Sequence, residues 1–294
     1  MTRAYVLIMS KPYFFYITGS NGFIGRHIVR CIEQSGFQWS RLYNDRGQVW
    51  RFGESPKDTV DSQYENILIH CAWDMKADSE SANQLMMVSS QRLFEFARQK
   101  EMAVCFISSM SSFQGCQSLY GKTKFSLEND LGQSGLRHII IRPGLVWENQ
   151  RALSGIIGTL EKIIKLLPLV PYLNHGHGRF YFTEVNELAQ KVVMILTDRL
   201  DWDNQYPVLA HKKSYTLKEI LLEIANKNKK TVLLFPFPVC FLKFIIKLLN
   251  LIGLKIIRND SLISLLNLDE RPMFSNISGQ LTSFSISEGI HKMS

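Results

Sequence analysis

A tyrosine and a lysine stand one helical turn apart in the stretch SLYGKTK, residues 118–124, shortly after the serine-rich stretch FISSMSS at 106–112. On a helix that begins near Leu119, Tyr120 and Lys124 would lie on one face. A phenol has an ordinary pKa of about 10, and an ammonium at ~4 Å is worth ~4 kcal/mol in a partly buried site. Lys124 is therefore expected to lower the pKa of Tyr120 by up to about three units, so that the phenol exchanges a proton near neutral pH.

The serines at 108–111 supply the kind of hydroxyl that such proton transfer needs. A hydroxyl held at the end of a strand could bind a substrate oxygen beside the phenol. No side chain carries a hydride, so a redox reaction at this place requires a nicotinamide cofactor. A tyrosine and a lysine at this spacing are also common on exposed helices, and the surrounding elements decide between the two interpretations.

The N-terminal part of the chain predicts a strand, a glycine-rich turn and a helix in the stretch YFFYITGSNGFIGRHIVRCIEQSG, residues 13–36. Its glycines follow the pattern TGxxGxxG, which lets the turn take positive φ, the backbone approach a pyrophosphate and the helix pack close to its strand. The helix N-terminus then offers free N–H groups to the phosphates. The residues expected to contact a dinucleotide here are Gly19, Asn21, Gly22, Phe23, Ile24 and Gly25.

The second strand, expected at 39–43, bears on which dinucleotide is bound. It leads into Tyr43, Asn44, Asp45 and Arg46, where an acidic residue would hold the ribose hydroxyls of NAD and an arginine would accept the extra phosphate of NADP. Asp45 and Arg46 could equally be ordinary turn residues. We take Asn44 and Arg46 as candidate cofactor contacts, and the pattern favours NADP over NAD.

Strands and helices alternate through the segment that follows. Buried strands are expected at 66–73, 102–109 and 138–144, with an amphipathic helix at 93–100. This alternation predicts an α/β protein with a doubly wound parallel sheet, the Rossmann fold. In such a sheet the ligand binds beyond the carboxyl ends of the strands, where the serines at 108–111 would lie.

Together these motifs resemble the extended short-chain dehydrogenase/reductase family, of the NAD-dependent epimerase/dehydratase type, whose members mostly modify nucleotide-linked sugars. The resemblance extends over nearly the whole chain. The pieces that carry it are TGSNGFIG (18–25), IHCAW (69–73), ISSMS (107–111), YGKTK (120–124), IRPG (141–144) and FYFTEVNELAQ (180–190). The expected cofactor contacts then also include Cys71, Ala72, Tyr120, Lys124 and Pro143.

The resemblance implies a role for each catalytic residue. Tyr120 is the general acid/base, Lys124 binds the nicotinamide ribose and tunes Tyr120, and a serine polarises the reacting C–O group. Alignment from the strand end selects Ser109, whereas counting back from the next glycine lands on Met110. We choose Ser109 as the catalytic serine and keep Ser111 as the alternative, with both as candidate substrate contacts.

One position departs from the family. Many relatives have an asparagine in the helix before the serine-ended strand, and this chain has Met86 at that place. The departure puts a proton-relay or helix-shaping role in doubt. Asn83, one turn earlier, is a candidate substitute.

The function implied by the resemblance is that of an NAD(P)-dependent oxidoreductase or epimerase acting on a nucleoside-diphosphate sugar, at C4, in cell-envelope polysaccharide synthesis. Tyr120 would exchange a proton with a sugar hydroxyl or keto oxygen while hydride moves between the sugar and the nicotinamide. Reductase and epimerase both remain open, and the apolar, lysine-bearing back half tilts the choice to reduction because it resembles sugar reductases of such pathways. A rival hypothesis is a non-catalytic dinucleotide sensor or assembly factor of the same fold.

The domain division expected from these patterns interleaves two parts. The dinucleotide-binding domain covers 12–150, with 180–213 returning to it, and a smaller, mostly helical substrate-binding part comprises 151–179 and 214–294. In the stretch NHGHGRF, Arg179 beside His175 and His177 could bind a diphosphate, although a solvated loop explains these residues equally well. A helix that starts after Thr216 is expected to use it as an N-cap, with Glu219 three residues on.

The most apolar segment is 235–258, and it is too short and too lysine-rich to span a membrane. Lys243 and Lys247 fall on one helical face opposite Phe244, Ile245 and Leu248, which is typical of a helix that lies on an anionic lipid surface. The candidate contact with a membrane is 239–258. A substrate-domain helix that covers the cleft, or a contact with a second copy in a homodimer, would have the same composition.

The bulk composition limits the other classes of function. The 294 residues carry a formal net charge of +8, and residues 191–258 hold twelve Lys/Arg against five Asp/Glu. No nucleic-acid-binding motif accompanies this basic region, so nucleic acid is not an expected partner. The five cysteines show no metal-ligand spacing, so we expect reduced thiols and no metal. Without an export signal, the expected location is the cytoplasm, with the inner membrane face as a peripheral site.

Overall fold

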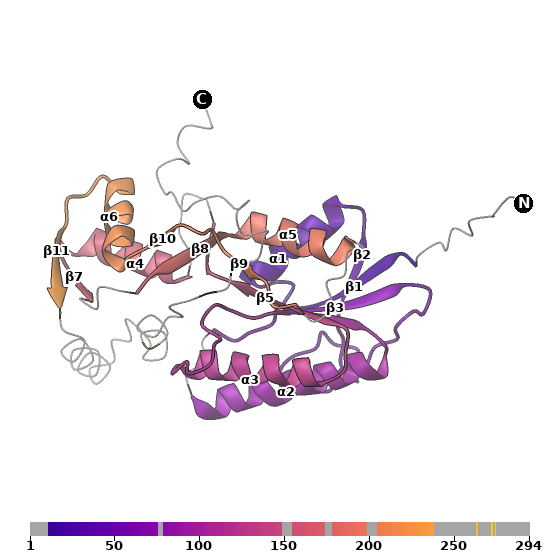
Figure 1. Cartoon of the computed structure of the whole chain (residues 1–294). Helices are drawn as coiled ribbons and strands as arrows, with labels where there is room; N and C mark the ends of the chain where they lie inside the picture. Colours follow the sequence, from indigo (N-terminus) through magenta and orange to yellow (C-terminus); the bar gives the residue numbers. More distant parts are fainter. Residues whose placement is uncertain are drawn as a thin grey trace, which may run out of the picture.

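A parallel sheet of six strands, in the order β2-β1-β3-β4-β5-β9, forms the centre of the described part of the chain (Figure 1). Every neighbouring pair in it is parallel. This is a computed structural model that describes residues 11–75, 79–148, 155–173, 178–198 and 205–237, with 263, 272 and 274. The strands are β1 Tyr13–Thr18, β2 Gln38–Arg41, β3 Glu65–His70, β4 Ala103–Ile107, β5 His138–Pro143 and β9 Val208–Leu209.

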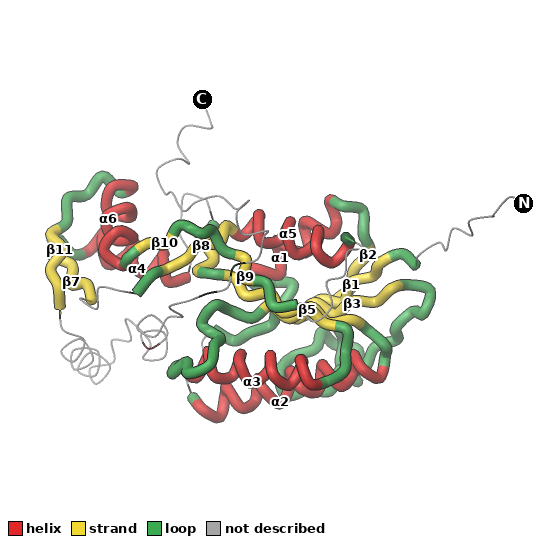
Figure 2. The backbone as a smooth tube through the Cα atoms, in the orientation of Figure 1, coloured by secondary structure: helices red, strands yellow, loops and turns green. Residues whose placement is uncertain are grey.

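Helices cover both faces of this sheet (Figures 1 and 2). One face carries α1 and α5, and the other carries α2 and α3. Their bounds are α1 Phe23–Gln34, α2 Glu80–Gln99, α3 Leu119–Gln133 and α5 Val185–Thr197. The doubly wound Rossmann fold predicted from the sequence is confirmed.

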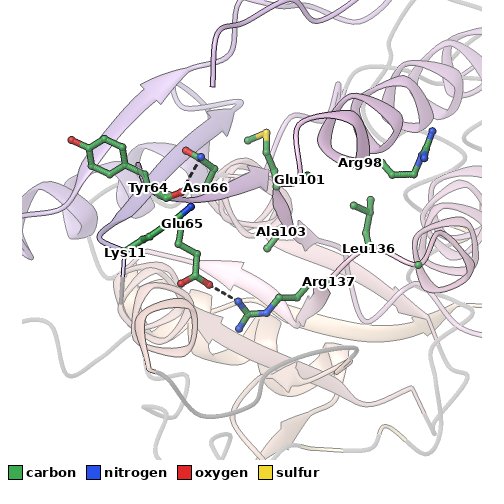
Figure 3. Close-up of a pocket in the computed structure, with 11 residues that line it drawn as sticks. Lys11, Tyr64, Glu65, Asn66, Arg98, Glu101, Ala103, Leu136 and Arg137 are labelled. Carbon is green, nitrogen blue, oxygen red and sulfur yellow. Dashed lines mark hydrogen bonds and ion pairs between the residues drawn. The ribbon is translucent and has the colours of Figure 1, made fainter. Parts of the chain in front are cut away.

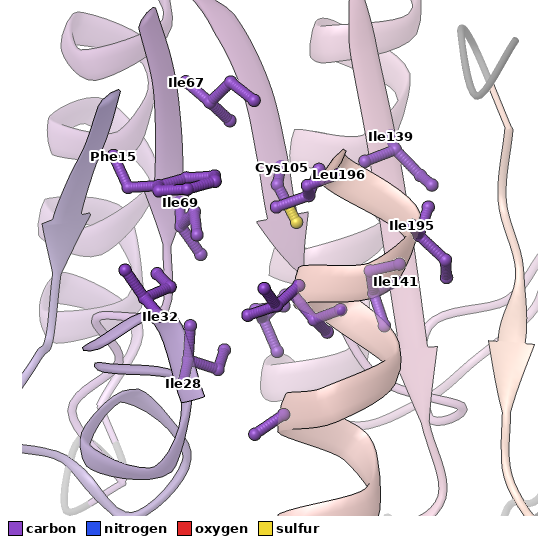
Figure 4. Packing of buried hydrophobic residues seen from close by; sticks show 14 of the residues in the cluster. Phe15, Ile28, Ile32, Ile67, Ile69, Cys105, Ile139, Ile141, Ile195 and Leu196 are labelled. Atoms are coloured by element: carbon purple, nitrogen blue, oxygen red, sulfur yellow. The ribbon is translucent and has the colours of Figure 1, made fainter. Parts of the chain in front are cut away.

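The strands read as continuous apolar runs because both of their faces are buried. Along β1, Phe15 (Figure 4) and Ile17 belong to the core cluster under α1 and α5. Tyr16 belongs to the cluster under α2 and α3. In β3 three successive residues, Ile67, Leu68 and Ile69, are fully buried. Burying each such side chain contributes about 1.5–3 kcal/mol, which makes this sheet a rigid base for the loops at its ends.

A smaller part lies at one end of the sheet, at the left of Figure 1. Its described residues form a three-stranded sheet of order β10-β8-β6, a parallel pair of β7 and β11, and the helices α4 and α6. The elements are β6 Leu145–Trp147, α4 Gly155–Leu166, β7 Leu169–Leu173, β8 Phe180–Glu184, β10 Ser214–Tyr215, α6 Leu217–Lys227 and β11 Leu233–Phe237. It has its own apolar core, built around Trp147, Phe182 and Ile224.

The chain passes between the two parts more than once. The strand β8 pairs with β6 and β10 in the smaller part, whereas α5 packs against α1 and β9 pairs with β5 in the main sheet. The helix α6 begins with a capping box formed by Thr216 and Glu219, as the sequence predicted. The exact domain division, and the mostly helical character of the second part, stay predictions because 238–294 lie almost entirely outside the described residues.

Candidate active site

The glycine turn between β1 and α1 has a geometry that other residues do not fit. Gly19 has φ +71°, and a Cβ on it would meet the backbone nitrogen of Ala72 at 2.6 Å. A Cβ on Gly25 would meet the carbonyl oxygen of Gly19 at 2.1 Å. The turn therefore packs its first glycine against the loop after β3 and its third glycine against the first, which leaves a closely fitted cradle at the start of α1.

The N-terminus of α1 is suited to an anion. Its N-cap is Gly22, which has no side-chain cap, and its first turn contains no acidic residue. Backbone N–H groups at such an end attract phosphate oxygens. The cradle and this helix end are together suited to an anion such as a pyrophosphate. Contact of a dinucleotide with Gly19, Asn21, Gly22, Phe23, Ile24 and Gly25 stays a prediction.

At the end of β2 the structure points to a residue that the sequence analysis missed. The guanidinium of Arg41, the last residue of β2, donates a hydrogen bond to the side-chain oxygen of Asn21 in the glycine turn, at 3.2 Å. Asn44 is buried, and its side-chain oxygen accepts the backbone N–H groups of Arg46 and Gln48, both at 3.0 Å. Asn44 thus stabilises a tight turn on which Arg46 is exposed, and Arg41 is the arginine that contacts the glycine turn.

Tyr120 and Ser109 meet beyond the carboxyl end of β4. Tyr120 lies in the first turn of α3, whose N-cap Ser118 accepts the backbone N–H of Gly121 at 3.0 Å. The side chain of Ser109 forms a hydrogen bond with the Tyr120 phenol, and its oxygen also accepts the backbone N–H of Ser111 at 3.1 Å. The structure therefore brings together the two residues that the sequence analysis had chosen as hydroxyl and phenol.

Ser108, the neighbouring serine, has a different partner. Its hydroxyl bonds to the carboxylate of Glu128, which also accepts from the Nε of Arg142 at 3.0 Å and from its Nη2. The side chain of Glu128 is 1% exposed, so this is a buried ion pair that ties the end of β4 to α3 and β5. Ser108 is thereby occupied in holding the elements that carry Ser109 and Tyr120.

Lys124 lies in an aromatic pocket. Its Nζ donates to the carbonyl oxygen of Ile107 at 2.7 Å and lies 4.0 Å from the ring centroid of Trp73 and 4.5 Å from that of Phe106. The distance from Nζ to the Tyr120 ring centroid is 6.0 Å. Lys124 is 2% exposed, so its ammonium is largely desolvated.

Burial has the largest effect on the pKa values of both Tyr120 and Lys124. Desolvation raises the pKa of Tyr120 to about 12, with the Ser109 hydrogen bond lowering it and the Glu128 charge raising it. Desolvation lowers the pKa of Lys124 to about 7, against the raising effects of Cys71 and Glu128. The expected lowering of the Tyr120 pKa by Lys124 is therefore wrong for the protein alone, because Nζ bonds to Ile107 and burial outweighs its charge.

A buried histidine links three elements beneath the site. His70, at the end of β3, bonds through Nδ1 to the Thr18 hydroxyl at 2.6 Å and through Nε2 to the Ser90 hydroxyl at 2.9 Å. Ser90 donates its own proton to the carbonyl oxygen of Met86, so Nε2 of His70 must carry the ring proton. Desolvation, with the charge of Lys124, lowers the pKa of His70 to about 3, which keeps the ring neutral.

The helix position that departs from the family is buried. Met86 is packed in α2, and its sulfur accepts the backbone N–H of Asp74 at 3.4 Å. The side-chain amide of Asn83 donates to the carbonyl oxygen of Ser79, the N-cap of its own helix, at 2.9 Å. Asn83 thus stabilises the start of α2, and its role as a substitute for the missing asparagine stays a prediction.

The other residues predicted to contact cofactor or substrate lie in several different elements. Cys71 and Ala72 adjoin the glycine turn, and burial raises the pKa of the Cys71 thiol to about 12. The carbonyl oxygen of Pro143 accepts the backbone N–H of Met110 at 3.0 Å, next to Ser109. Arg179 is exposed just before β8, where its charge acts on Glu219 at the start of α6. His175 and His177 lie outside the described residues.

A cavity of about 560 Å³ is found elsewhere, at the amino-terminal edge of the sheet (Figure 3). Its lining includes Glu65 and Ala103, the first residues of β3 and β4, and Arg137, which pairs with Glu65. Because Ser109 and Tyr120 follow the opposite ends of the strands, this cavity is separate from the candidate active site.

Comparisons with curated proteins give two distant relatives, and no protein-family model matches the chain. One is a sterol-4-alpha-carboxylate 3-dehydrogenase, decarboxylating, from Dictyostelium discoideum, 24% identical over 191 residues, which covers 50% of the chain and 58% of the relative. The other is a ceramide reductase from Caulobacter vibrioides, 26% identical over 193 residues, which covers 60% and 59%. The chain thus spans less than two thirds of the length of either relative.

Solved structures share the fold over more of the chain. A dTDP-4-dehydrorhamnose reductase from Clostridium acetobutylicum has a TM-score of 0.61 and 18% identity, with 76% of this chain and 84% of that chain covered. A UDP-glucose 4-epimerase from Thermus thermophilus in complex with NAD has a TM-score of 0.55 and 20% identity, with 76% and 86% covered. A dTDP-4-dehydrorhamnose reductase from Bacillus anthracis in complex with NADP has a TM-score of 0.58 and 15% identity, with 79% and 86% covered.

These structures are extended short-chain dehydrogenases/reductases that share the doubly wound sheet. The chain therefore has the fold of the extended short-chain dehydrogenases/reductases, and its resemblance to that family is confirmed.

Proposed function

We propose that the chain is an NAD(P)-dependent oxidoreductase or epimerase that acts on a nucleoside-diphosphate sugar at C4. The observation that carries this proposal is the hydrogen-bonded pair of Ser109 and Tyr120, with Lys124 on the same helix turn, at the sheet edge where the glycine turn also lies. Support comes from the solved structures of similar fold, which are named as sugar-nucleotide reductases and an epimerase. A role in cell-envelope polysaccharide synthesis is part of the same proposal.

The protonation of Tyr120 favours the reductive direction. Because burial raises the pKa of Tyr120 to about 12, its phenol holds the proton at neutral pH and acts as a general acid. A bound nicotinamide cofactor would supply the hydride. As the carbonyl carbon of a 4-keto sugar gains that hydride, its oxygen takes the phenol proton and becomes a hydroxyl, and the phenolate regains a proton from solvent. Ser109 would donate a hydrogen bond to the same oxygen and stabilise its developing charge.

NADP is the proposed cofactor, and the contact between Arg41 and Asn21 supports it. A guanidinium beside the glycine turn is placed to bind a phosphate on the adenosine ribose, and guanidinium groups fit phosphate oxygens bidentately. The glycine turn and the start of α1 would hold the pyrophosphate, and Lys124 the nicotinamide ribose. Arg179 and Ser111 are proposed as substrate contacts, and a homodimer as the assembly.

The test of this function is the absorbance near 340 nm of the protein with NADPH and a panel of UDP- and dTDP-linked 4-keto sugars. Steady loss of absorbance with one of them is the expected result and means net reduction. An isomerised sugar without net loss would mean epimerisation. If the protein binds NADPH and changes no sugar, the non-catalytic sensor becomes the better description.

A second candidate substrate is a lipid that carries a keto or hydroxyl group. The observation that favours it is that the two curated relatives are named for a sterol carboxylate and a ceramide. The same residues would reduce or oxidise such a group, because Ser109 and Tyr120 act only on the C–O unit. The same absorbance assay with a keto-sterol and a keto-ceramide dispersed in detergent separates this candidate from the sugar nucleotides.

We also propose peripheral contact with an anionic membrane, through a leucine surface on the smaller part. This surface consists of Leu166, Leu167, Leu169 and Leu233, of which Leu166 is 78% and Leu233 is 69% exposed. Leu169 and Leu233 are register partners in the parallel pair of β7 and β11, so they point to the same side. The lysines close to it in sequence are Lys162, Lys165, Lys229 and Lys230, and this charge favours anionic lipid headgroups.

None of the described helices is both long and apolar enough to cross a bilayer. The predicted lipid-facing segment 239–258 lies outside the described residues. The leucine surface is tested by sedimentation with anionic and with neutral vesicles at low salt, for the protein and for the double variant Leu166→Ser/Leu233→Ser. Met194→Ser, at an exposed apolar residue of α5, is the matched control. Equal sedimentation of protein and double variant, or dimers in place of vesicle binding, would argue for another occupant.

A further inference from the structure

We propose that Trp73 is a positioning residue that holds the Lys124 ammonium at its ring face, packs perpendicular to the Tyr120 ring, and so keeps Lys124 charged within a desolvated site. The Trp73 and Tyr120 rings are nearly perpendicular, with centroids 5.5 Å apart and an interplanar angle of 85°. The Lys124 Nζ lies 4.0 Å from the Trp73 centroid, well within cation–π range. One indole thus contacts both groups of the candidate acid/base pair.

The backbone around Trp73 is fixed from two sides. Its neighbour Ala72 packs against Gly19 so closely that a Cβ on that glycine would overlap the Ala72 nitrogen. Its other neighbour, Asp74, donates its backbone N–H to the sulfur of Met86 in α2. Trp73 itself packs against the core cluster under α2 and α3. The position of the indole is therefore set by the glycine turn on one side and by α2 on the other.

Aromatic rings, and no carboxylate of the described residues, surround the Lys124 ammonium. On its own helix Lys124 has Tyr120 and Glu128 as titratable neighbours, and Glu128 is paired with Arg142 and Ser108. From β3 and the loop after it come His70 and Cys71, which burial keeps uncharged. Lys124 forms no ion pair within the described part of the chain. Its close partners are the Ile107 carbonyl and the faces of Trp73 and Phe106.

This arrangement determines whether removal of the Trp73 indole raises or lowers the pKa of Lys124. Burial lowers the pKa of Lys124 to about 7, and a desolvated cation–π contact opposes that lowering. Removing the indole while leaving an apolar side chain should therefore lower the pKa of Lys124 further, by about one unit. If Trp73 served only to fill space, its removal would admit water to Lys124 and raise this pKa instead.

The inference rests on the proposed function in one respect: that function explains why Lys124 and Tyr120 should be held together. Its test needs no substrate. The test is the pH titration of the Lys124 Cε resonance in protein labelled with ¹³C-lysine, the resonance being assigned from its loss in Lys124→Met. In the unaltered protein we expect a midpoint near neutral pH. In Trp73→Leu we expect a midpoint about one unit lower, and in Trp73→Phe an intermediate value because a smaller ring face remains.

Trp39→Leu is the matched control, because Trp39 is also partly buried against the sheet but bonds to Glu33 on the other face, away from Lys124. It should lose stability without moving the Lys124 midpoint. An unchanged or higher midpoint in Trp73→Leu would overturn the inference. Should the shift occur in a protein that turns over no sugar or lipid, the positioning role would stand and the proposed function would fail.

Discussion

The hydroxyl of Ser109 and the phenol of Tyr120 are hydrogen-bonded to each other just beyond the carboxyl end of β4. The adjacent serine, Ser108, has a structural role instead, because its hydroxyl bonds to the buried carboxylate of Glu128. Ser108 and Ser109 therefore have different roles at this strand end. Ser108 secures the elements of the site, and Ser109 bonds to the Tyr120 phenol.

Ser109→Ala should lower turnover by about 10²–10³-fold, because it removes one hydrogen-bond donor to the reacting oxygen. Ser111→Ala is the control, since Ser111 is the serine that the sequence left as an alternative and its backbone N–H donates to Ser109. Initial rates of NADPH oxidation measure both. A larger loss for Ser111→Ala than for Ser109→Ala would reverse their assignment.

Gly25→Ala should abolish dinucleotide binding and lower the melting temperature, because the added Cβ would lie 2.1 Å from the carbonyl oxygen of Gly19. Gly36→Ala is the control: it places a side chain at positive φ, but its Cβ would meet nothing within 4 Å, so only a strain of about 1 kcal/mol is expected. Thermal unfolding and fluorescence titration with NADPH measure the two effects. Normal NADPH binding by Gly25→Ala would show that the turn is not the cofactor cradle.

Arg41→Gln should weaken NADPH binding by about 10–100-fold and leave NADH binding nearly unchanged, because it removes a charge-assisted contact to the extra phosphate. Arg46→Gln is the matched control: Arg46 was the arginine chosen from the sequence, and it lies exposed on the turn that Asn44 stabilises. Dissociation constants for both cofactors decide between them. A selective loss of NADPH in Arg46→Gln alone would return the assignment to the sequence-based choice.

The stability of the protein should rise with pH between about 7 and 8.5, by up to ~1.4 kcal/mol per pH unit from Lys124. In this window the unfolded chain still binds the proton of this lysine, whose unfolded pKa is about 10.4, while burial lowers the folded pKa to about 7. The folded state binds fewer protons, so raising the pH favours it. Denaturant unfolding at several pH values measures the slope.

Lys124→Met should remove this part of the slope, whereas Lys122→Met, at an exposed lysine of the same helix, should keep it. The buried Cys71 and Cys105 thiols act in the opposite direction above pH ~8.5, and the Tyr120 phenol does so above pH ~10, because burial raises the folded pKa of each group. The comparison therefore stops at pH ~8.5. Identical slopes in the protein and in Lys124→Met would mean that Lys124 is not desolvated in solution.

The fold could be predicted because its signals are local. The apolar run of β3, the glycines at 19, 22 and 25 and the capping residues of α6 each act within one element and its turn. Alternation of such elements then leaves few topologies for a parallel sheet. The pairing of Ser109 with Tyr120 followed as well, because the end of a strand and the start of the next helix meet at one edge.

Long-range electrostatics could not be predicted in this way. The sequence places Lys124 one turn from Tyr120, but only the fold shows that Trp73 and Phe106 surround its ammonium and that burial, not charge, sets both pKa values. Arg41 was missed for a similar reason: its contact with Asn21 joins two strand ends that the sequence separates. The role of His70 could not be predicted either, because its hydrogen-bond partners come from β1 and α2.

The most direct test of the proposed chemistry is the turnover of Tyr120→Phe with the substrate found in the panel, measured beside Tyr64→Phe at the opposite edge of the sheet. We predict that Tyr120→Phe binds the cofactor as the unaltered protein does and loses about 10²–10⁴-fold in rate, while Tyr64→Phe keeps its rate. Equal turnover by Tyr120→Phe and the unaltered protein would contradict the assignment of Tyr120 as the proton donor.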